Sequence, residues 1–254
     1  MKKITVIIQA RLGSTRLPNK VLADIEGKSM LWHLINRLKH SKYNPELVIA
    51  TTTSENDKKI IDLSKNLGLK SLAGSEDDVL DRYYQAALKN NAETIVRITA
   101  DCPMIDPVVM DKVIEKFFEE NSDYASNTHP PTYPDGLDVE VFSFKTLKKA
   151  WNEAKRSTER EHVTYFIYTH PELFKLSNVV NPIDLNELRW TVDEKEDLDF
   201  VREIYKNLYY KREIFLMEDI LKLLREKPEL IDMNKKFMRD EGLLKSLKED
   251  RIIK

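Results

Sequence analysis

The chain has 254 residues, with 41 Lys and Arg residues against 43 Asp and Glu residues and a formal net charge of −2. This balance leaves no excess of positive charge for binding nucleic acid, and the single cysteine excludes an intrachain disulfide. Because no apolar run reaches about 18 residues and no signal-peptide pattern follows Met1, we expect a cytoplasmic protein that does not enter a membrane.

Short apolar runs alternate with amphipathic helical patterns along the sequence. This alternation predicts an α/β fold, with a mainly parallel, Rossmann-like sheet that carries helices on both faces. The expected strands are residues 4–9, 47–51, 69–73, 94–99, 123–126, 137–144, 173–180 and 187–192. The expected helices are residues 29–40, 54–67, 78–90, 106–121, 145–155 and 157–169, and another begins near Glu194. In the helix over residues 106–121, we expect Asp106 to be the capping residue and Pro107 to take the first helical position.

We expect one main domain over residues 1–213, because a chain of this length supports a single large core. Residues 214–254 form a charged amphipathic pattern that is interrupted at Pro228, which predicts a helical extension. We expect this extension to pack on the domain or on a partner subunit. The Pro-rich residues 128–136 predict a surface loop suited to a substrate lid.

A basic loop follows the first expected strand, at the edge where open α/β sheets bind their ligands. Residues 10–20 hold three cations, two hydroxyl side chains and a glycine, and they contain no Asp or Glu. Arg makes forked contacts with phosphate oxygens, Lys acts as a point charge, and glycine lets the backbone approach closely. The pattern predicts a polyphosphate site; the alternative is a solvated basic loop. The predicted nucleotide-binding residues of this loop are Ala10, Arg11, Gly13, Ser14, Arg16 and Lys20.

Two common phosphate-binding motifs are absent from the sequence. Gly27-Lys28-Ser29 resembles the end of a Walker loop, but that motif needs a glycine where position 22 holds leucine. No Gly-x-Gly-x-x-Gly pattern occurs either. Gly27 and Ser29 therefore indicate a turn and the cap of the following helix.

The pattern Arg-x-x-Ser-x-Arg-Leu-Pro-x-Lys after an amino-terminal strand resembles the nucleotide loop of the cytidylyltransferases that make CMP-activated sugar acids. This family includes the CMP-KDO and acylneuraminate synthetases, and the resemblance is greatest to its spore coat polysaccharide biosynthesis protein F branch. Further stretches match in family order. They are residues 74–83, 96–103, 135–140, 159–164 and 189–193.

The resemblance implies a nucleotidyltransferase that moves CMP from CTP to an acidic sugar of the nonulosonic-acid kind and releases pyrophosphate, for surface polysaccharide synthesis. It also implies Mg²⁺ as the cofactor, held by Asp101 and Asp193. Each of these aspartates follows an expected strand, and Mg²⁺ prefers such oxygen ligands. Two structural alternatives remain open: a turn role for Asp101, and a capping box between Asp193 and Glu196. Asp197 could support the site or be solvated.

Arg11, Lys20 and Asp101 are the expected catalytic residues, because this transfer needs charge neutralisation and positioning rather than a covalent nucleophile. We therefore interpret Cys102 as a packing residue. The resemblance implies contacts to the base from Ser75, Asp78 and Arg82. The expected substrate-binding residues are Arg97, Asp138, Glu140, Glu161 and His162.

Structural roles remain open for several of these residues. Asp138 and Glu140 could lie on an exposed strand face, and Thr158 could form a capping box with Glu161. Two other functions also stay open: a nucleotidyltransferase for another NTP or a non-sugar acceptor, and a non-catalytic nucleotide-binding protein. We expect CTP and an acidic sugar as partners, no nucleic acid or membrane, and possible assembly as a homodimer.

Overall fold

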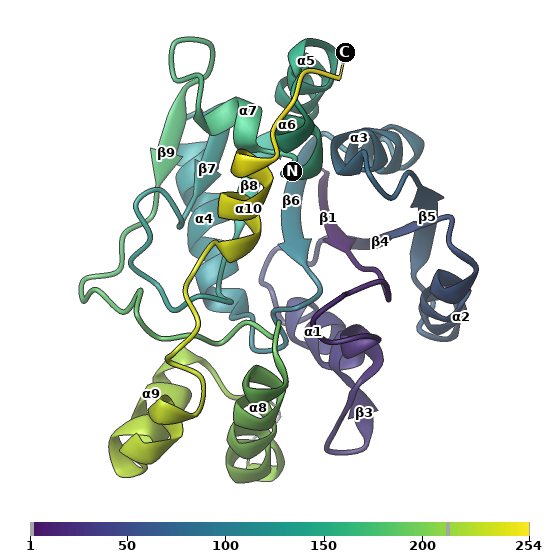
Figure 1. The fold of residues 1–254 in the computed structure, drawn as a ribbon. Helices are drawn as coiled ribbons and strands as arrows, with labels where there is room; N and C mark the ends of the chain where they lie inside the picture. Colours follow the sequence, from purple (N-terminus) through teal and green to yellow (C-terminus); the bar gives the residue numbers. More distant parts are fainter. Residues whose placement is uncertain (1–2, 212–213, 254) are drawn as a thin grey trace.

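The computed structural model describes residues 3–211 and 214–253. Within these residues, seven strands form the central sheet. The strand order is β5-β4-β1-β6-β8-β7-β9 (Figure 1). Neighbouring strands from β5 to β6 are parallel, whereas β8 runs antiparallel to both β6 and β7. The strands are β1 (Ile4–Gln9), β4 (Glu46–Thr52), β5 (Lys70–Gly74), β6 (Thr94–Thr99), β7 (Tyr124–Ser126), β8 (Glu140–Ser143) and β9 (Leu176–Asn178).

Helices cover both faces of this sheet. As a result, alternate side chains of the central strand β1 are buried in two different apolar cores. Val6 and Ile8 belong to a large apolar core with α1, α4 and α8, whereas Ile7 packs with α3 and α5 on the opposite face. A short hairpin, β2 (Asp24–Ile25) and β3 (Lys28–Ser29), precedes α1. The helices up to residue 208 are α1 (Met30–Leu38), α2 (Lys58–Asn66), α3 (Val79–Lys89), α4 (Pro107–Glu119), α5 (Phe144–Glu153), α6 (Ser157–Glu161), α7 (Tyr165–Tyr168) and α8 (Lys195–Leu208).

Two helix starts form as the sequence predicts. Ser29 caps α1, since its side chain accepts a hydrogen bond from the backbone N–H of Trp32. Asp106 caps α4 in the same way, and Pro107 occupies the first helical position, where its missing N–H has no cost. The α/β class and the mainly parallel sheet are confirmed.

Two expected elements differ in the structure. Residues 187–192 do not form a strand; Arg189 makes a single bridge to Asp135, and the rest of the segment is irregular. Residues 157–169 form two short helices, α6 and α7, because Val163 adopts a positive φ of 46° between them. Both departures come from tertiary contacts that local patterns do not report.

The irregular segment passes very close to Gly136. The backbone N–H of Trp190 donates to the carbonyl of Asp135 at 2.6 Å, and Gly136 has a φ of +105°. A Cβ at position 136 would lie 2.6 Å from the backbone nitrogen of Thr191. Glycine is therefore required here both by its conformation and by the approach of the second chain segment.

The described carboxyl-terminal residues form α9 (Met217–Glu226), a 3-10 helix η4 (Pro228–Met233) and α10 (Glu241–Lys248). The interruption at Pro228 occurs as expected, whereas the expected boundary at residue 213 lies outside the described residues. Ile220 and Leu224 of α9 join the large apolar core, but α10 has no buried residue and packs beside α6 (Figure 1). Among the described helices, none has the length and apolar character needed to span a membrane.

Candidate active site

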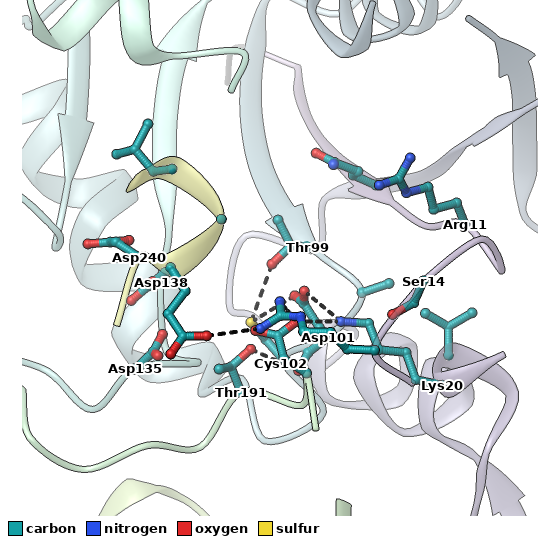
Figure 2. Close-up of a pocket in the computed structure, with 18 of the residues that line it drawn as sticks. Arg11, Ser14, Lys20, Thr99, Asp101, Cys102, Asp135, Asp138, Thr191 and Asp240 are labelled. Carbon is teal, nitrogen blue, oxygen red and sulfur yellow. Dashed lines mark hydrogen bonds and ion pairs between the residues drawn. The ribbon is translucent and has the colours of Figure 1, made fainter. Parts of the chain in front are cut away.

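A cavity of about 380 Å³ opens at the carboxyl ends of β1 and β6 (Figure 2). Parallel strands of an open α/β sheet present ligand sites at this edge. Its walls come from the basic loop after β1, the residues after β6, the stretch before β8, the junction after α6, the irregular segment before α8, and residues 238 and 240–243. Polar and charged side chains dominate the lining, which suits a charged ligand.

Lys20 lies in the wall of this cavity, at the start of a 3-10 helix η1 (Lys20–Leu22). Its Nζ donates to Oδ1 of Asp193 at 2.8 Å, to Oδ2 of Asp101 at 3.2 Å and to the carbonyl of Val192 at 2.7 Å. Burial lowers the pKa of Lys20, but the two carboxylates outweigh it and raise the pKa. The structure thus brings both aspartates to one cation, as the metal prediction requires.

The donor atoms around this point suit Mg²⁺. The ammonium of Lys20 marks a place where two carboxylates already stabilise positive charge, and Mg²⁺ takes one or two carboxylates with water and substrate phosphates. Across residues 3–211 and 214–253, no group of three or more His, Cys, Asp and Glu side chains could hold a metal by itself. Any further ligands would therefore come from substrate and water.

Asp193 owes its position to Arg189 and Asp197. The guanidinium of Arg189 contacts Oδ2 of Asp193 at 3.2 Å and Oδ1 of the fully buried Asp197 at 2.9 Å. Oδ2 of Asp197 also accepts the backbone N–H groups of Asp193 and Glu194, both at 2.9 Å. The capping box of α8 is thus formed by Glu194 and Asp197, not by Asp193 and Glu196, and Asp197 is not solvated.

The basic loop is anchored to the sheet by a buried carboxylate. Oδ1 of Asp57, which is 1% exposed, accepts the backbone N–H of Leu12 at 2.8 Å. This bond fixes the path of the loop while leaving two of its arginines partly exposed, with 46% of the Arg11 side chain and 38% of the Arg16 side chain accessible. Of the loop residues predicted to bind nucleotide, Gly13 alone is not part of the cavity wall.

Arg16 faces several carboxylates. Its guanidinium lies 3.1 Å from Asp193, 3.3 Å from Glu194 and 3.2 Å from Glu241, which comes from the start of α10. Arg11 pairs more loosely with Glu76, at 3.3 Å. These partly exposed pairs are weak, so an incoming polyphosphate can replace them.

A second cavity, of about 590 Å³, continues past Arg11 toward α3. Arg82 lies in its wall; its Nη1 donates to the carbonyl of Ser75 at 2.6 Å. In the described part of the chain, Nε and Nη2 of Arg82 are buried without a hydrogen-bond partner. Unpaired buried N–H groups are costly, so the two groups are a feature of this wall that the folded chain alone does not satisfy.

Asp78 is turned away from both cavities. It caps α3 by accepting a hydrogen bond from the backbone N–H of Asp81 at 2.8 Å. Its carboxylate also accepts hydrogen bonds from the guanidinium of Arg160 at 2.6 to 3.0 Å. Ser75 accepts the backbone N–H of Asp78 at 3.0 Å. Asp78 thus shapes the loop beside Arg82, and the structure gives it no direct access to either cavity.

The expected substrate-binding acids occupy two different environments. Asp138 precedes β8 and lines the first cavity, where burial raises its pKa to about 6. Glu140 lies behind the wall in an ion pair with Arg97, and it accepts hydrogen bonds from Tyr124 and Thr164. Burial raises the pKa of Glu140, but Arg97 and these hydrogen bonds outweigh it and lower the pKa.

His162 and Glu161 lie at the junction of α6 and α7. His162 lines both cavities, and Glu161 lines the second. Both side chains contact the hydroxyl of Ser246 in α10, at 2.9 Å from Nε2 of His162 and 2.8 Å from Oε2 of Glu161. The capping box of α6 uses Glu159, whose carboxylate accepts two backbone N–H groups, rather than Thr158 with Glu161.

Several cavity residues were given no role from the sequence. Arg189 and Asp135 belong to stretches of family resemblance, which was the available signal, while Glu241 and its neighbours lie in an extension that offered none. Cys102 is buried in the wall, and burial raises the pKa of its thiol well above the usual value. This environment suits a packing residue rather than a nucleophile.

Several known proteins are similar to this chain in sequence and in fold. The family model for cytidylyltransferases matches residues 5–236. Uncharacterized protein MJ1063 of Methanocaldococcus jannaschii is 41% identical over 81% of this chain and 84% of its own length. The spore coat polysaccharide biosynthesis protein SpsF of Bacillus subtilis is 32% identical over 90% of this chain and 97% of its own length.

Two further matches cover different lengths. A 3-deoxy-manno-octulosonate cytidylyltransferase of Trichlorobacter lovleyi is 34% identical over 45% of each chain. A solved cytidylyltransferase structure from Leptospira borgpetersenii is similar with a TM-score of 0.88 at 30% identity, covering 94% of this chain and 100% of that chain.

The fold and these matches define a nucleotidyltransferase. The chain belongs to the cytidylyltransferase family, and the resemblance to that family and to its spore coat protein is confirmed.

Proposed function

We propose that this enzyme transfers CMP from CTP to an acidic sugar with Mg²⁺ as cofactor, releasing pyrophosphate, in the synthesis of surface polysaccharide. One observation carries the proposal: Asp101 and Asp193 meet at Lys20 inside a cavity walled by the basic loop. The names of relatives support the acceptor class, since one acts on 3-deoxy-manno-octulosonate and another serves spore coat polysaccharide.

In this reaction a hydroxyl oxygen of the acceptor attacks the α-phosphorus of CTP, and the bond to pyrophosphate breaks. The protein has to position both substrates and neutralise charge on the leaving group. Arg11, Arg16 and Lys20 supply three positive charges along one wall for this purpose. Asp101 and Asp193 would hold Mg²⁺, which when bound supplies further charge and polarises phosphate oxygens.

The second cavity suits the base and ribose. The unpaired Nε and Nη2 of Arg82 could donate to the carbonyl oxygen of a pyrimidine, and Ser75 and Asp78 set the loop that holds Arg82. Arg11 lies between the two cavities and lines both. A nucleotide can therefore extend from Arg82 in the second cavity to Lys20 in the first, passing Arg11 on the way.

The acceptor would enter beside Asp138 and His162, which line the first cavity; Figure 2 shows Asp138 opposite Arg11 and Lys20. Asp138 can accept hydrogen bonds from sugar hydroxyls, whereas Glu161 lines the second cavity, next to His162. Glu140 and Arg97 pair with each other, so Glu140 contributes by holding Arg97 in the wall of the second cavity.

The test is release of pyrophosphate from each of the four NTPs, with Mg²⁺ or with excess EDTA, over a panel of acidic and neutral sugars. CTP-selective release that needs both Mg²⁺ and an acidic acceptor supports the proposal. Release with a different NTP or with a neutral acceptor favours the broader nucleotidyltransferase. Tight NTP binding without turnover across the whole panel contradicts the proposal and favours a non-catalytic binding protein.

We propose further that the enzyme acts in the cytoplasm, where a reducing environment keeps the thiol of Cys102 free. A homodimer is also proposed, and an apolar surface supports it: Val180 and Ile183, 58% and 68% exposed, lie at or near a cavity of about 350 Å³. Sedimentation equilibrium of the purified chain tests this assembly, since a dimer has twice the mass of the chain.

A further inference from the structure

Three side chains line both cavities and mark the place where the two cavities meet. Among the residues that the structure describes, they are Gln9, Arg11 and His162. In the proposed function, the base lies in the second cavity and the pyrophosphate end lies at Lys20 in the first. The α-phosphate joins these two parts of the nucleotide, so its place is at this junction. Of the three side chains, His162 is the one that can accept a proton at neutral pH, because a guanidinium has no acceptor and an amide is a very weak base.

A hydroxyl group of α10 determines which ring nitrogen of His162 carries the proton. Oγ of Ser246 lies 2.9 Å from Nε2 of His162, and it also contacts Oε2 of Glu161 at 2.8 Å and the carbonyl of Gly242 at 3.0 Å. A carboxylate and a carbonyl can only accept hydrogen bonds, and the hydroxyl has a single proton to donate. Because both of these partners need that proton, Nε2 is the donor in its contact with Ser246. The ring therefore has its proton on Nε2 and a lone pair on Nδ1.

The lone pair on Nδ1 is available to a ligand. The His162 side chain is 24% exposed, and in the described part of the chain Nδ1 has no hydrogen-bond partner. Burial lowers the pKa of His162, and the charge of Arg97 lowers it further. The carboxylates of Glu161, Asp240 and Glu140 raise the pKa, but by less than burial lowers it. The imidazole is therefore neutral at neutral pH and can take up a proton.

We propose that His162 is the general base of the transfer, and that its Nδ1 accepts the proton of the attacking hydroxyl. As this O–H bond breaks, the acceptor oxygen bonds to the α-phosphorus, and the bond from the α-phosphorus to the leaving oxygen breaks. Pyrophosphate leaves with the electron pair of that bond, and the imidazolium then gives its proton to water. Ser246 is a positioning residue, because it fixes the tautomer while Glu161 receives its proton. This inference rests on the proposed function, which supplies the attacking hydroxyl and CTP.

The first measurement is nitrogen-15 NMR of the enzyme labelled at histidine, which reports the protonation of each ring nitrogen without any need for turnover. We expect the His162 signals at neutral pH to show a protonated Nε2 and an unprotonated Nδ1. Their absence from the spectrum of His162→Gln assigns them. In Ser246→Ala, where the hydroxyl that fixes the tautomer is missing, both tautomers should be present.

The second measurement is pyrophosphate release with CTP and 3-deoxy-manno-octulosonate, or with another acidic sugar if the wild-type enzyme prefers it. His162→Gln should lower kcat about a hundredfold to ten-thousandfold, the usual contribution of a positioned general base. Ser246→Ala should lower kcat about tenfold, the scale of one lost hydrogen bond, and Ser246→Thr should keep the wild-type rate because it retains the hydroxyl. His40→Gln is the matched control, since His40 is exposed and lies in neither cavity wall.

Imidazole added to the solution separates base catalysis from a structural role. His162→Ala leaves space at the junction of the two cavities, so added imidazole should restore part of the lost kcat. The restored rate should rise with pH as more of the imidazole becomes unprotonated. A side chain that only supported the fold would show neither effect.

Two outcomes would overturn the inference while the wild-type enzyme is active. One is a near-normal kcat in His162→Gln, or in His162→Asn if circular dichroism shows that the glutamine variant does not fold. The other is an NMR spectrum in which Nδ1 of His162 carries the proton and Nε2 does not. If the wild-type enzyme releases no pyrophosphate with any acceptor, the proposed function itself fails and this inference fails with it. Turnover by the wild-type enzyme therefore distinguishes the two failures.

Discussion

The Nζ atom of Lys20 lies 2.8 Å from Oδ1 of Asp193, although 173 positions separate the two residues in the sequence. The contact joins the basic loop after β1 to the irregular segment before α8. Asp101, at the end of β6, approaches the same Nζ from a third segment. The electrostatic centre of the site is therefore a product of the tertiary fold and depends on all three segments.

Replacement of Lys20 or Asp101 should therefore abolish most of the activity. We expect Lys20→Ala and Asp101→Asn each to lower kcat by at least about a hundredfold, the scale for losing one preorganised electrostatic group. Pyrophosphate release measures the effect, and circular dichroism checks that the fold is kept. Lys58→Ala is a suitable control, because Lys58 is exposed on α2 outside both cavity walls. Near-normal rates in both variants would contradict the site.

The pair between Arg16 and Glu241 should compete with the nucleotide. Because we propose that Arg16 binds the triphosphate, Glu241→Gln should tighten CTP binding by up to about fivefold, as expected for a partly exposed ion pair. Arg16→Ala should weaken binding about tenfold or more. Calorimetric titration with CTP measures both, with Glu229→Gln as an exposed control. Weaker binding by Glu241→Gln would show that Glu241 assists the nucleotide instead.

The buried pair of Glu140 and Arg97 should matter for stability. Glu140→Gln leaves Arg97 without its counter-charge, so we expect a loss of about 3 kcal/mol in the free energy of unfolding at pH 7. Urea unfolding measures this loss. Glu203→Gln breaks a partly exposed ion pair with Lys206, about one helical turn away in α8. It should change the free energy of unfolding by less than about 1 kcal/mol.

The sign of the pH dependence follows from the lowered pKa of Glu140 in the folded protein. The stabilisation by its carboxylate is complete above the unfolded-state pKa of about 4.3 and is lost as the pH falls through the lower folded-state pKa. The difference between the wild type and Glu140→Gln should thus be constant from pH 7 to about pH 5 and shrink below about pH 4. A difference that grows on acidification would contradict this assignment.

Gly136→Ala should reduce both stability and activity. Its Cβ would lie 2.6 Å from the backbone of Trp190 and Thr191, and the positive φ adds strain of about 1–3 kcal/mol. Relief of the clash would shift the segment that carries Asp193. Thermal unfolding and pyrophosphate release measure the two effects; a destabilised variant with unchanged kcat would show that this contact does not hold Asp193.

The sequence was sufficient to predict the α/β class and most helices, because the apolar periods and the caps at Ser29 and Asp106 are local signals. It failed for residues 187–192, whose apolar and β-branched residues look like a strand. There the backbone is held by two hydrogen bonds with Asp135 and one to Asp101 instead of a ladder. A local pattern cannot distinguish these two situations.

For the site, the basic loop and the two aspartates were predictable from charge, spacing and resemblance. The sequence could not indicate that Asp78 faces Arg160, or that Glu140 is buried against Arg97, because each partner lies far away in the chain. It also gave no sign that Asp240 and Glu241 reach the cavity. Long-range ion pairs decided these placements, and spacing carries no information about them.

The cavity has one wall just after β1 and another near the carboxyl-terminal end of the chain, at residues 238 and 240–243. During synthesis on the ribosome, the sheet and the basic loop can fold long before residues 238–243 have been made. A nascent chain would therefore already contain the loop that we propose binds phosphate, but its cavity would lack the wall formed by these later residues. Catalysis would therefore become possible only after residues 238–243 have been made and have packed over the cavity. Proteolytic cleavage in this segment would remove that wall and reopen the cavity of a mature enzyme.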